Sequence, residues 1–431
     1  MPIGTKITNF SEQQWVFLGF YRRPGLLNES VMRRLRNDRP YVFRPPYKRK
    51  WFLPSALRVN RSVLLGRKYF IREIRDKGFR EVAELIGQGN SVIFAPNHAD
   101  HSDPHVMMEI GRRHGLPLYF MAAREVFEVG NFASWALQSC GVFSVDRDGP
   151  DISAIKTALG ILGKGDPLVL YPEGEIYHHH ERLDPLHEGV ASISIKSARR
   201  LSEGRFAYIV PVGMLFTHDP SVQDTFDRRL TVLEDRIGWT PRPGMPVDER
   251  IIRLGRGVLA LKETEFFCEA GQGEIQSRLK TFCEGLLEDV ESRRGTDSRA
   301  TTAPERVRAL RYRIRRRLLD SERPASGEER IELLDDLDRV FTALQAHSYI
   351  GDYLLEDATL DRRAETVMKL EEDLLGFPVY PAPRDACVVA GEPIPVSEML
   401  SRGVLEGKDA ATMLTGILED RLSELIRKSP C

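Results

Sequence analysis

Short apolar runs alternate with longer segments of helical spacing through the first half of the chain. The runs are SVIFAP (91–96), PLYFMAA (117–123), GVFSVDR (141–147), PLVLYPEG (167–174) and AYIVPVGM (207–214). Apolar strands of this length that alternate with helices of one to four turns are typical of a sheet covered on both faces. The pattern therefore predicts an α/β fold with a mostly parallel sheet flanked by helices.

The strand pattern stops near residue 216, and a long helical block follows. Apolar residues there recur at three- and four-residue spacing, the mark of amphipathic helices. Two such stripes are Ile251, Leu254, Val258 and Leu261, and Leu334, Leu337, Phe341 and Leu344. ACVVAGEPIPV then restores a strand, and a last helical pattern extends through residue 428. We therefore predict four segments: a basic, aromatic N-terminal arm (1–60), an α/β domain (61–215), a helical insertion (216–385), and a closing strand and helix of the α/β domain (386–431).

Composition narrows the class of protein. Of 431 residues, 42% are hydrophobic, which is ordinary for a globular protein and argues against wholesale disorder. The formal net charge of -1 gives no overall field that would recruit nucleic acid. The five cysteines form no C-x-x-C pair, and no apolar run approaches the length of a spanning helix. We expect a cytoplasmic protein that reaches a membrane only at its surface.

The stretch NHADHSD combines a histidine and an aspartate that could act together. In a continuous helix, His98 and Asp103 would point about 140° apart, and in a strand they would lie on opposite faces. SVIFAP is strand-like, however, and SDP resembles a helix start with Ser102 or Asp103 as N-cap and Pro104 at the first helical position. The turn between strand and helix could bring the two side chains together, so that the carboxylate orients a histidine that accepts a proton.

A metal site is the main alternative at this stretch. His98, His101, Asp103 and His105 are possible ligands, and YHHHER adds His178, His179 and His180. The H-x-H-x-D-H order of a zinc-dependent hydrolase is absent, and three consecutive histidines diverge on any regular backbone. We therefore expect no metal among the site residues.

Four blocks in order resemble the glycerol-phosphate and lysophosphatidate acyltransferases: N-H-x4-D, GVFSVDR, YPEGE and IVPVGM. The resemblance covers roughly residues 61–215, together with VVAGEPIPV and the last helix. It implies a glycerolipid acyltransferase-like α/β fold in which His98 is the general base and Asp103 orients it. By the same resemblance, Arg147 grips the acceptor's phosphate, as a guanidinium fork suits phosphate oxygens.

The third block both matches and departs from the family pattern. Glu173 and Gly174 match its E-G, so the resemblance implies that they belong to the substrate-binding residues. Arg124 lies where the family often has a further basic residue, a possible phosphate contact. The family usually continues with T-R, whereas Glu175 and Ile176 stand at those positions here. A phosphate-binding arginine is therefore missing from its expected place.

The resemblance implies transfer of a fatty acyl group from an acyl thioester to a hydroxyl of glycerol 3-phosphate or lysophosphatidate, in phospholipid synthesis. The donor is acyl-coenzyme A or an acyl carrier protein thioester, and no cofactor is expected. Two alternatives stay open: a metal-dependent hydrolase that uses the histidine-rich clusters, and a catalytically degenerate lipid-binding or scaffold protein.

Two basic patches bear on membrane contact. Residues 44–80 carry twelve Lys and Arg against two acids, interleaved with Trp51 and Phe52, which favours an anionic membrane surface. Residues 306–317 hold seven arginines, for which we prefer a solvated helix face or salt bridges to acidic helices. With the neutral overall charge, neither patch predicts nucleic-acid binding.

Overall fold

One mixed sheet lies at the centre of the protein. The computed structural model describes residues 40–296 and 300–428, so most of the predicted N-terminal arm lies outside the described residues. The strands within them are β1 (Ile71–Lys77), β2 (Ser91–Pro96), β3 (Tyr119–Ala123), β4 (Val142–Val145), β5 (Leu168–Val169), β6 (Ala207–His218), β7 (Arg384–Ala390) and β8 (Ile394–Pro395). Their order across the sheet is β1-β7-β6-β2-β5-β3-β4, with β8 on β6.

Strand direction and the late return of β7 decide the fold class. β6 pairs antiparallel with β7 and β8, and the other pairs are parallel. The chain runs from β6 to β7 through a long helical segment, after which β7 lies between β1 and β6. The predicted fold class, a mostly parallel sheet flanked by helices with a long helical insertion, is confirmed.

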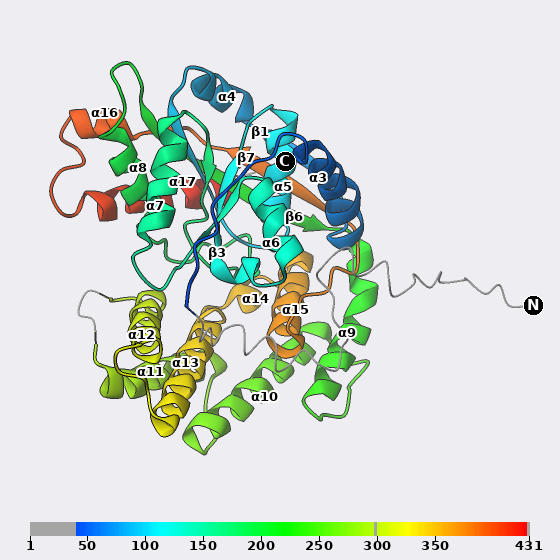
Figure 1. Ribbon diagram of the computed structural model, residues 1–431. Helices are drawn as coiled ribbons and strands as arrows, with labels where there is room; N and C mark the ends of the chain where they lie inside the picture. The colour runs from blue at the N-terminus through cyan, green and yellow to red at the C-terminus, as the bar shows by residue number, and fades with distance from the viewer. Residues whose placement is uncertain (1–39, 297–299, 429–431) are drawn as a thin grey trace, which may run out of the picture.

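Helices cover both faces of the sheet (Figure 1). All of β2 is buried; Val92 and Phe94 belong to one core, Ile93 and Ala95 to the other, as strand alternation requires. This two-sided burial explains why the strands are apolar runs rather than alternating patterns. The helical elements of this part are α3 (Leu53–Val59), η1 (Asn60–Lys68), α4 (Phe79–Gly87), α5 (Asp103–Arg113), η2 (Arg124–Phe127), α6 (Asn131–Ser139), α7 (Ile152–Gly163), α8 (Gly189–Ala198), α16 (Val396–Ser401) and α17 (Ala410–Lys428).

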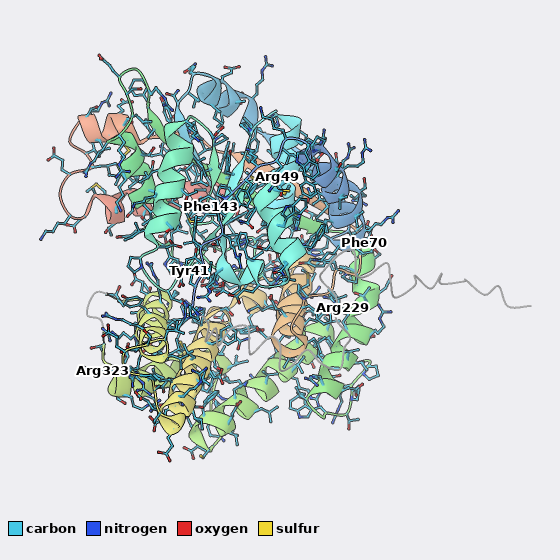
Figure 2. The ribbon with its side chains drawn as sticks, viewed as in Figure 1. Tyr41, Arg49, Phe70, Phe143, Arg229 and Arg323 are labelled. Carbon is cyan, nitrogen blue, oxygen red and sulfur yellow. The ribbon has the colours of Figure 1, made fainter. Side chains whose placement is uncertain are left out.

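The insertion forms a helical layer of its own, in the lower part of Figure 1. Its elements are η3 (Pro220–Val222), α9 (Gln223–Arg236), α10 (Val247–Phe267), α11 (Ile275–Arg294), α12 (Ala303–Leu318), α13 (Gly327–His347), α14 (Tyr353–Glu356) and α15 (Leu360–Leu375). One apolar core lies among α10 to α13, and a second between α9, α10 and α15. Figure 2 places Arg229 of α9 in this layer and Phe143 of β4 in the α/β part.

Ion pairs join α12 to the α/β part. Arg315 contacts Asp146 at 2.8 Å and Asp148 at 2.5 Å, and Arg311 contacts Asp148 at 3.1 Å. Arg306 pairs instead with Glu291 of α11 at 2.9 Å. These contacts support our preference for salt bridges over membrane contact in the 306–317 patch.

Local details differ from the sequence prediction. Strand β1, IREIRDK, has no apolar run that would predict it. It lies at the edge of the sheet, and only its Ile71 and Ile74 are buried. α5 begins at Asp103, so Pro104 is its second residue rather than its first, and Ser102 makes no side-chain cap. Leu261 was expected in the buried stripe of α10 but is 54% exposed.

Candidate active site

The N-H-x4-D stretch forms the turn between β2 and α5. Asn97, the first residue after β2, clamps this turn to β6: its Nδ2 donates to the Met214 carbonyl at 3.0 Å, and its Oδ1 accepts from the Met214 N–H at 2.7 Å. The clamp fixes the chain direction one residue before His98. The turn therefore starts from a rigid, buried strand end.

His98 and Asp103 meet across this turn. The His98 Nδ1 lies 2.9 Å from Asp103 Oδ2, and that oxygen also accepts the Asp100 N–H at 2.9 Å. The Asp103 side chain is fully buried, and the His98 side chain keeps 14% of its surface exposed. Because Nδ1 is engaged with the carboxylate, Nε2 is the nitrogen that can accept a proton from a substrate.

Burial dominates the electrostatics of the pair. It lowers the pKa of His98 to about 3, with a further lowering from His101. Burial and the nearby Asp100 carboxylate raise the pKa of Asp103. The lowered pKa of His98 keeps the imidazole uncharged at neutral pH, the state in which a histidine acts as a base. The ring of Tyr171 stacks on His98 with centroids 4.0 Å apart and shields it from water.

Arg384, from the start of β7, supports the turn from a distant part of the sequence. Its Nη2 donates to Asp100 Oδ1 at 2.8 Å and to Ser102 Oγ at 3.0 Å, and its Nε donates to the Tyr69 carbonyl at 3.2 Å. The guanidinium is buried, as is Asp100. Sequence reasoning missed this residue because the contact spans the whole insertion and Arg384 belongs to no motif.

Glu173 and Gly174 shape the loop beside the histidine. Glu173 is buried; its Oε1 accepts the His98 N–H at 2.6 Å and its Oε2 accepts the Asp184 N–H at 3.2 Å. Gly174 has φ +74°, and a Cβ there would lie 2.9 Å from His187 Cδ2. Glu173 therefore supports the backbone of the turn, and the glycine is required by conformation and space.

Arg147 is held by acidic partners and a carbonyl. Its Nη1 lies 2.8 Å from Glu175 Oε1 and also donates to the Gly174 carbonyl, and its Nη2 lies 3.7 Å from Glu125. The Arg147 side chain is 28% exposed. The residue that departs from the family pattern, Glu175, is thus the ion-pair partner of the predicted phosphate-binding cation.

Arg124 is more deeply enclosed than Arg147. Its side chain is 3% exposed, with Glu128 at 3.3 Å and Asp146 at 3.6 Å. Its guanidinium also lies over the ring of Tyr41, 5.4 Å from the centroid. An acceptor phosphate would have to compete with these partners for Arg124.

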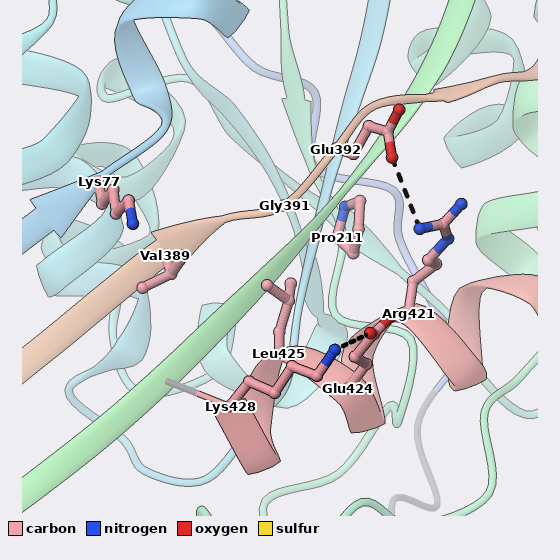
Figure 3. Close-up of a pocket in the computed structure, with 9 residues that line it drawn as sticks. All are labelled: Lys77, Pro211, Val389, Gly391, Glu392, Arg421, Glu424, Leu425 and Lys428. Carbon is pink, nitrogen blue, oxygen red and sulfur yellow. Dashed lines mark hydrogen bonds and ion pairs between the residues drawn. The ribbon is translucent and has the colours of Figure 1, made fainter. Parts of the chain in front are cut away.

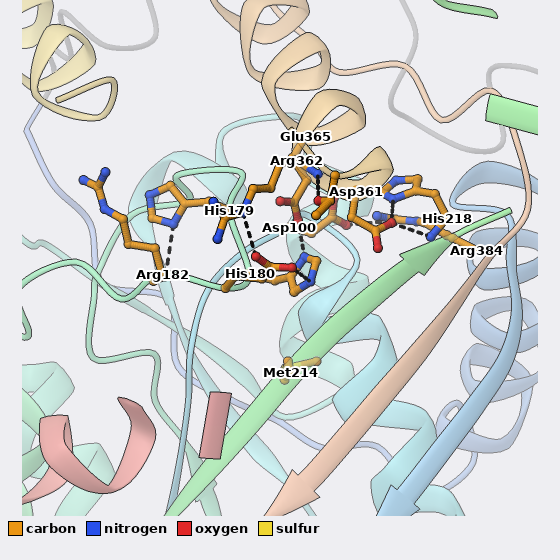
Figure 4. A network of polar contacts seen from close by, with 12 residues as sticks. Asp100, His179, His180, Arg182, Met214, His218, Asp361, Arg362, Glu365 and Arg384 are labelled. Atoms are coloured by element: carbon orange, nitrogen blue, oxygen red, sulfur yellow. Dashed lines mark hydrogen bonds and ion pairs between the residues drawn. The ribbon is translucent and has the colours of Figure 1, made fainter. Parts of the chain in front are cut away.

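Of the remaining histidines of the two clusters, His101 and His178 contact the same carboxylate, that of Glu372, and the others have partners of their own. His178, His179 and His180 each contact a different carboxylate, respectively those of Glu372, Asp184 and Glu365. The predicted divergence of the three consecutive imidazoles is therefore confirmed, and Figure 4 shows His180 directed toward Glu365. His105 pairs with Asn60 at 2.6 Å, away from the His98–Asp103 contact.

A pocket lies at the opposite end of β7 from Arg384. Val389 and Gly391, Lys77 at the end of β1 and Leu425 of α17 are among its lining residues (Figure 3). Since Arg384 is the residue of β7 that reaches the turn, this pocket is separate from the His98–Asp103 pair.

Within the described ranges, no helix combines the length and the apolar character that crossing a bilayer requires. The predicted cytoplasmic, membrane-surface location is not tested by this finding.

Comparison with known proteins adds family information. Residues 78–215 match the family model described as Acyltransferase, and this range contains every predicted site residue. A 1-acyl-sn-glycerol-3-phosphate acyltransferase from Streptococcus pneumoniae is 39% identical over 97 residues, which cover 22% of this chain. The match spans 36% of that protein's length. No solved structure matches the chain.

Proposed function

We propose that the protein transfers a fatty acyl group in phospholipid synthesis, because residues 78–215 match the Acyltransferase family model. The donor is an acyl thioester, and the acceptor is a hydroxyl of a glycerol-phosphate-type molecule such as lysophosphatidate or glycerol 3-phosphate. The observation that carries the proposal is the 2.9 Å contact between His98 Nδ1 and Asp103 Oδ2 within the matched domain.

The mechanism is direct transfer with His98 as general base. His98 Nε2 takes the proton of the acceptor hydroxyl as its oxygen attacks the thioester carbonyl. Collapse of the tetrahedral intermediate breaks the carbon–sulfur bond, and the thiolate leaves with the proton from the imidazolium. Asp103 holds the ring through Nδ1 and stabilises the imidazolium while it carries the proton. The thioester is already activated, so no covalent acyl-enzyme and no cofactor are required.

Arg147 is the proposed contact for the acceptor phosphate. A guanidinium can bind two oxygens of a phosphate in bidentate fashion. The acceptor phosphate would compete for Arg147 with the Glu175 carboxylate, which lies 2.8 Å from the guanidinium. Arg124 contributes positive charge from its buried position. Glu173 and Gly174 position the loop rather than bind substrate.

We further propose that the protein works at an anionic membrane surface. Trp51 and Phe132 are 69% and 62% exposed, and both rings pack against Trp135, at 6.2 Å and 5.7 Å between centroids. Two exposed cations, Lys50 and Arg58, lie close to Trp51 in the sequence. Exposed aromatic rings with nearby cations suit the interface of an anionic bilayer, where the acyl acceptor resides.

A labelled acyl thioester and a panel of acceptors test the activity. Purified protein is incubated with acyl-coenzyme A or acyl carrier protein thioester and with glycerol 3-phosphate, lysophosphatidate or a non-phosphorylated alcohol, and products are read by lipid mass spectrometry. We expect label in a glycerol-phosphate lipid. Label in free fatty acid alone, with no acceptor product, would instead support the hydrolase alternative. No turnover of any donor would support the degenerate scaffold.

A further inference from the structure

His101, His178 and Glu372 form a cluster that the proposed reaction does not use. The ligand atoms of the three side chains all lie within 4.8 Å of one another. His101 Nε2 lies 3.0 Å from Glu372 Oε1, and His178 Nε2 contacts the other oxygen of the same carboxylate. The two imidazoles therefore face one carboxylate from both sides.

The three side chains come from three separate parts of the chain. His101 lies in the turn after β2, His178 in the loop after β5, and Glu372 near the end of α15 in the helical insertion. The site therefore joins the turn that carries His98 to the inserted helices. Neighbouring pairs, such as His180 with Glu365 in Figure 4, also join this loop to α15, but with one imidazole per carboxylate.

His178 shows two signs of an unusual role. Its backbone has φ 55°, in the left-handed region that residues other than glycine rarely adopt. Its Nδ1 is buried and has no hydrogen-bond partner among the described residues. An unsatisfied buried nitrogen points to a water, an ion or strain at that position. The hydrogen bond to Glu372 leaves the imidazole only half satisfied.

The donor set and its surroundings suit zinc. Two imidazole nitrogens and one carboxylate oxygen are a ligand set that Zn²⁺ prefers, with bonds of about 2.0–2.2 Å. The three ligand atoms lie within 4.8 Å of one another, close enough for one ion to lie between them. The buried Asp100 carboxylate, which pairs with Arg384, also acts on His101 and favours a positive charge there, whereas Lys68 opposes it.

Exposure leaves room for a further ligand. The His178 side chain is 1% exposed, whereas those of His101 and Glu372 are 37% and 29% exposed. One side of the cluster therefore opens to water, as in zinc sites with three protein ligands.

We propose that His101, His178 and Glu372 bind one Zn²⁺ ion that ties α15 of the insertion to the turn carrying His98. The proposal does not rest on the proposed acyl transfer, because the three ligands take no part in the proton transfer. It also differs from the metal-dependent hydrolase alternative, which would require the ion to act on the substrate.

Direct metal binding tests the proposal without reference to activity. The full chain is treated with a chelator, and Zn²⁺ is then titrated in competition with a chromophoric zinc indicator. Co²⁺, added to a second sample, reports coordination geometry through its visible absorption. We expect one ion per chain and the intense absorption bands of a tetrahedral Co²⁺ site.

Matched variants locate the site. Glu372→Gln and His101→Asn should each weaken Zn²⁺ binding by roughly 10–100-fold or more, since even loss of a residue behind the ligands costs that much. Glu365→Gln, on the same helix and paired with His180, should leave the affinity unchanged. His101→Asn changes a partly exposed side chain, so it answers the question if Glu372→Gln does not fold. Absence of the Co²⁺ bands, or equal Zn²⁺ affinity in wild type and both ligand variants, would overturn the proposal.

Discussion

At the scale of single residues, Glu175 and Arg147 raise the question of how an acceptor phosphate binds. The guanidinium is in contact with the Glu175 carboxylate at 2.8 Å and with the carbonyl of Gly174. A phosphate must displace the carboxylate or share the arginine with it. Glu175 therefore tunes the affinity of the proposed acceptor site, and it does so from a position where the family usually has a neutral threonine.

Glu175→Gln should strengthen binding of a phosphate-bearing acceptor. The variant removes the competing charge and leaves a side chain of the same size, so we expect KM for the acceptor to fall about tenfold, equivalent to ~1.4 kcal/mol. Steady-state kinetics with lysophosphatidate measure this change. Glu84→Gln, which removes an exposed carboxylate of α4 that lies 3.9 Å from Arg80, is the control for a general change in charge. An unchanged or higher KM in Glu175→Gln would contradict the role of Arg147.

Glu173 should make stability depend on pH. Burial raises its pKa from 4.5 to about 7. Between these values the folded state binds more protons than the unfolded state, so this contribution to stability is present below pH 4.5 and is lost as pH rises through 7. A shift of this size corresponds to about 3 kcal/mol.

The comparison of wild type with Glu173→Gln isolates that contribution. Urea unfolding at several pH values should show that wild type loses stability relative to the variant from pH 5 to pH 8. The glutamine carries no charge, so its own stability should follow only the remaining groups. A pH-independent difference between the two proteins would show that the pKa of Glu173 is not raised.

At the scale of elements, the turn between β2 and α5 is held from several directions. Asn97 ties it to β6, Glu173 accepts the His98 N–H from the loop after β5, and Arg384 reaches it from β7. The His98–Asp103 geometry therefore depends on strands that are far apart in the sequence. These contacts explain how a short turn holds the side chains of His98 and Asp103 in a fixed arrangement.

Arg384→Met should destabilise the fold and the turn together. It leaves the Asp100 carboxylate buried without its guanidinium, and removal of one partner of a buried pair typically costs about 3–5 kcal/mol. Denaturant unfolding measures this loss. The double variant Arg384→Met with Asp100→Asn should recover part of it, because no buried charge is then unpaired. Equal stability of wild type and Arg384→Met would contradict the structural role of the pair.

The predictability of elements follows from how each strand is buried. β2 and β6 are covered on both faces and therefore appear in the sequence as apolar runs. β1 lies at the edge with charged residues at most positions, so hydrophobicity alone does not reveal it. The His98–Asp103 contact was predictable because both residues flank one local turn. The contact of Asp100 with Arg384 was not, since nothing in either segment specifies the other.

At the scale of the whole molecule, the aromatic residues just before α3 and on α6 and the cations of residues 44–80 lie on the α/β part of the fold rather than on the insertion. In the insertion, Arg311 and Arg315 are used for internal ion pairs with Asp148. The two basic patches, residues 44–80 and 306–317, look alike in composition. Their contacts in the fold show that they differ in the use of their cations. The sequence therefore does not predict which acidic residue pairs with each of these arginines.

Membrane binding should depend on the aromatic residues and on salt. The double variant Trp51→Ala with Phe132→Ala should co-sediment with anionic liposomes several-fold less than wild type, because two exposed rings are removed from the interface. Wild-type binding should also weaken at high salt, since cations attract the anionic lipid. Ile331→Ala changes a side chain that is 69% exposed in the insertion and should bind like wild type. Equal binding of wild type and the double variant would argue against this surface.

The most direct measurement of the central claim is the rate of acyl transfer by His98→Ala, compared with wild type and with His114→Gln. His114 contacts Asp76 at 2.6 Å just after the C-terminal end of α5, so its replacement controls for loss of a histidine at the opposite end of the helix that follows His98. Loss of a general base predicts a fall in kcat/KM of about 10²–10⁴-fold for His98→Ala in a folded protein, with His114→Gln close to wild type. A folded His98→Ala protein that transfers acyl groups within a few-fold of the wild-type rate would contradict the account.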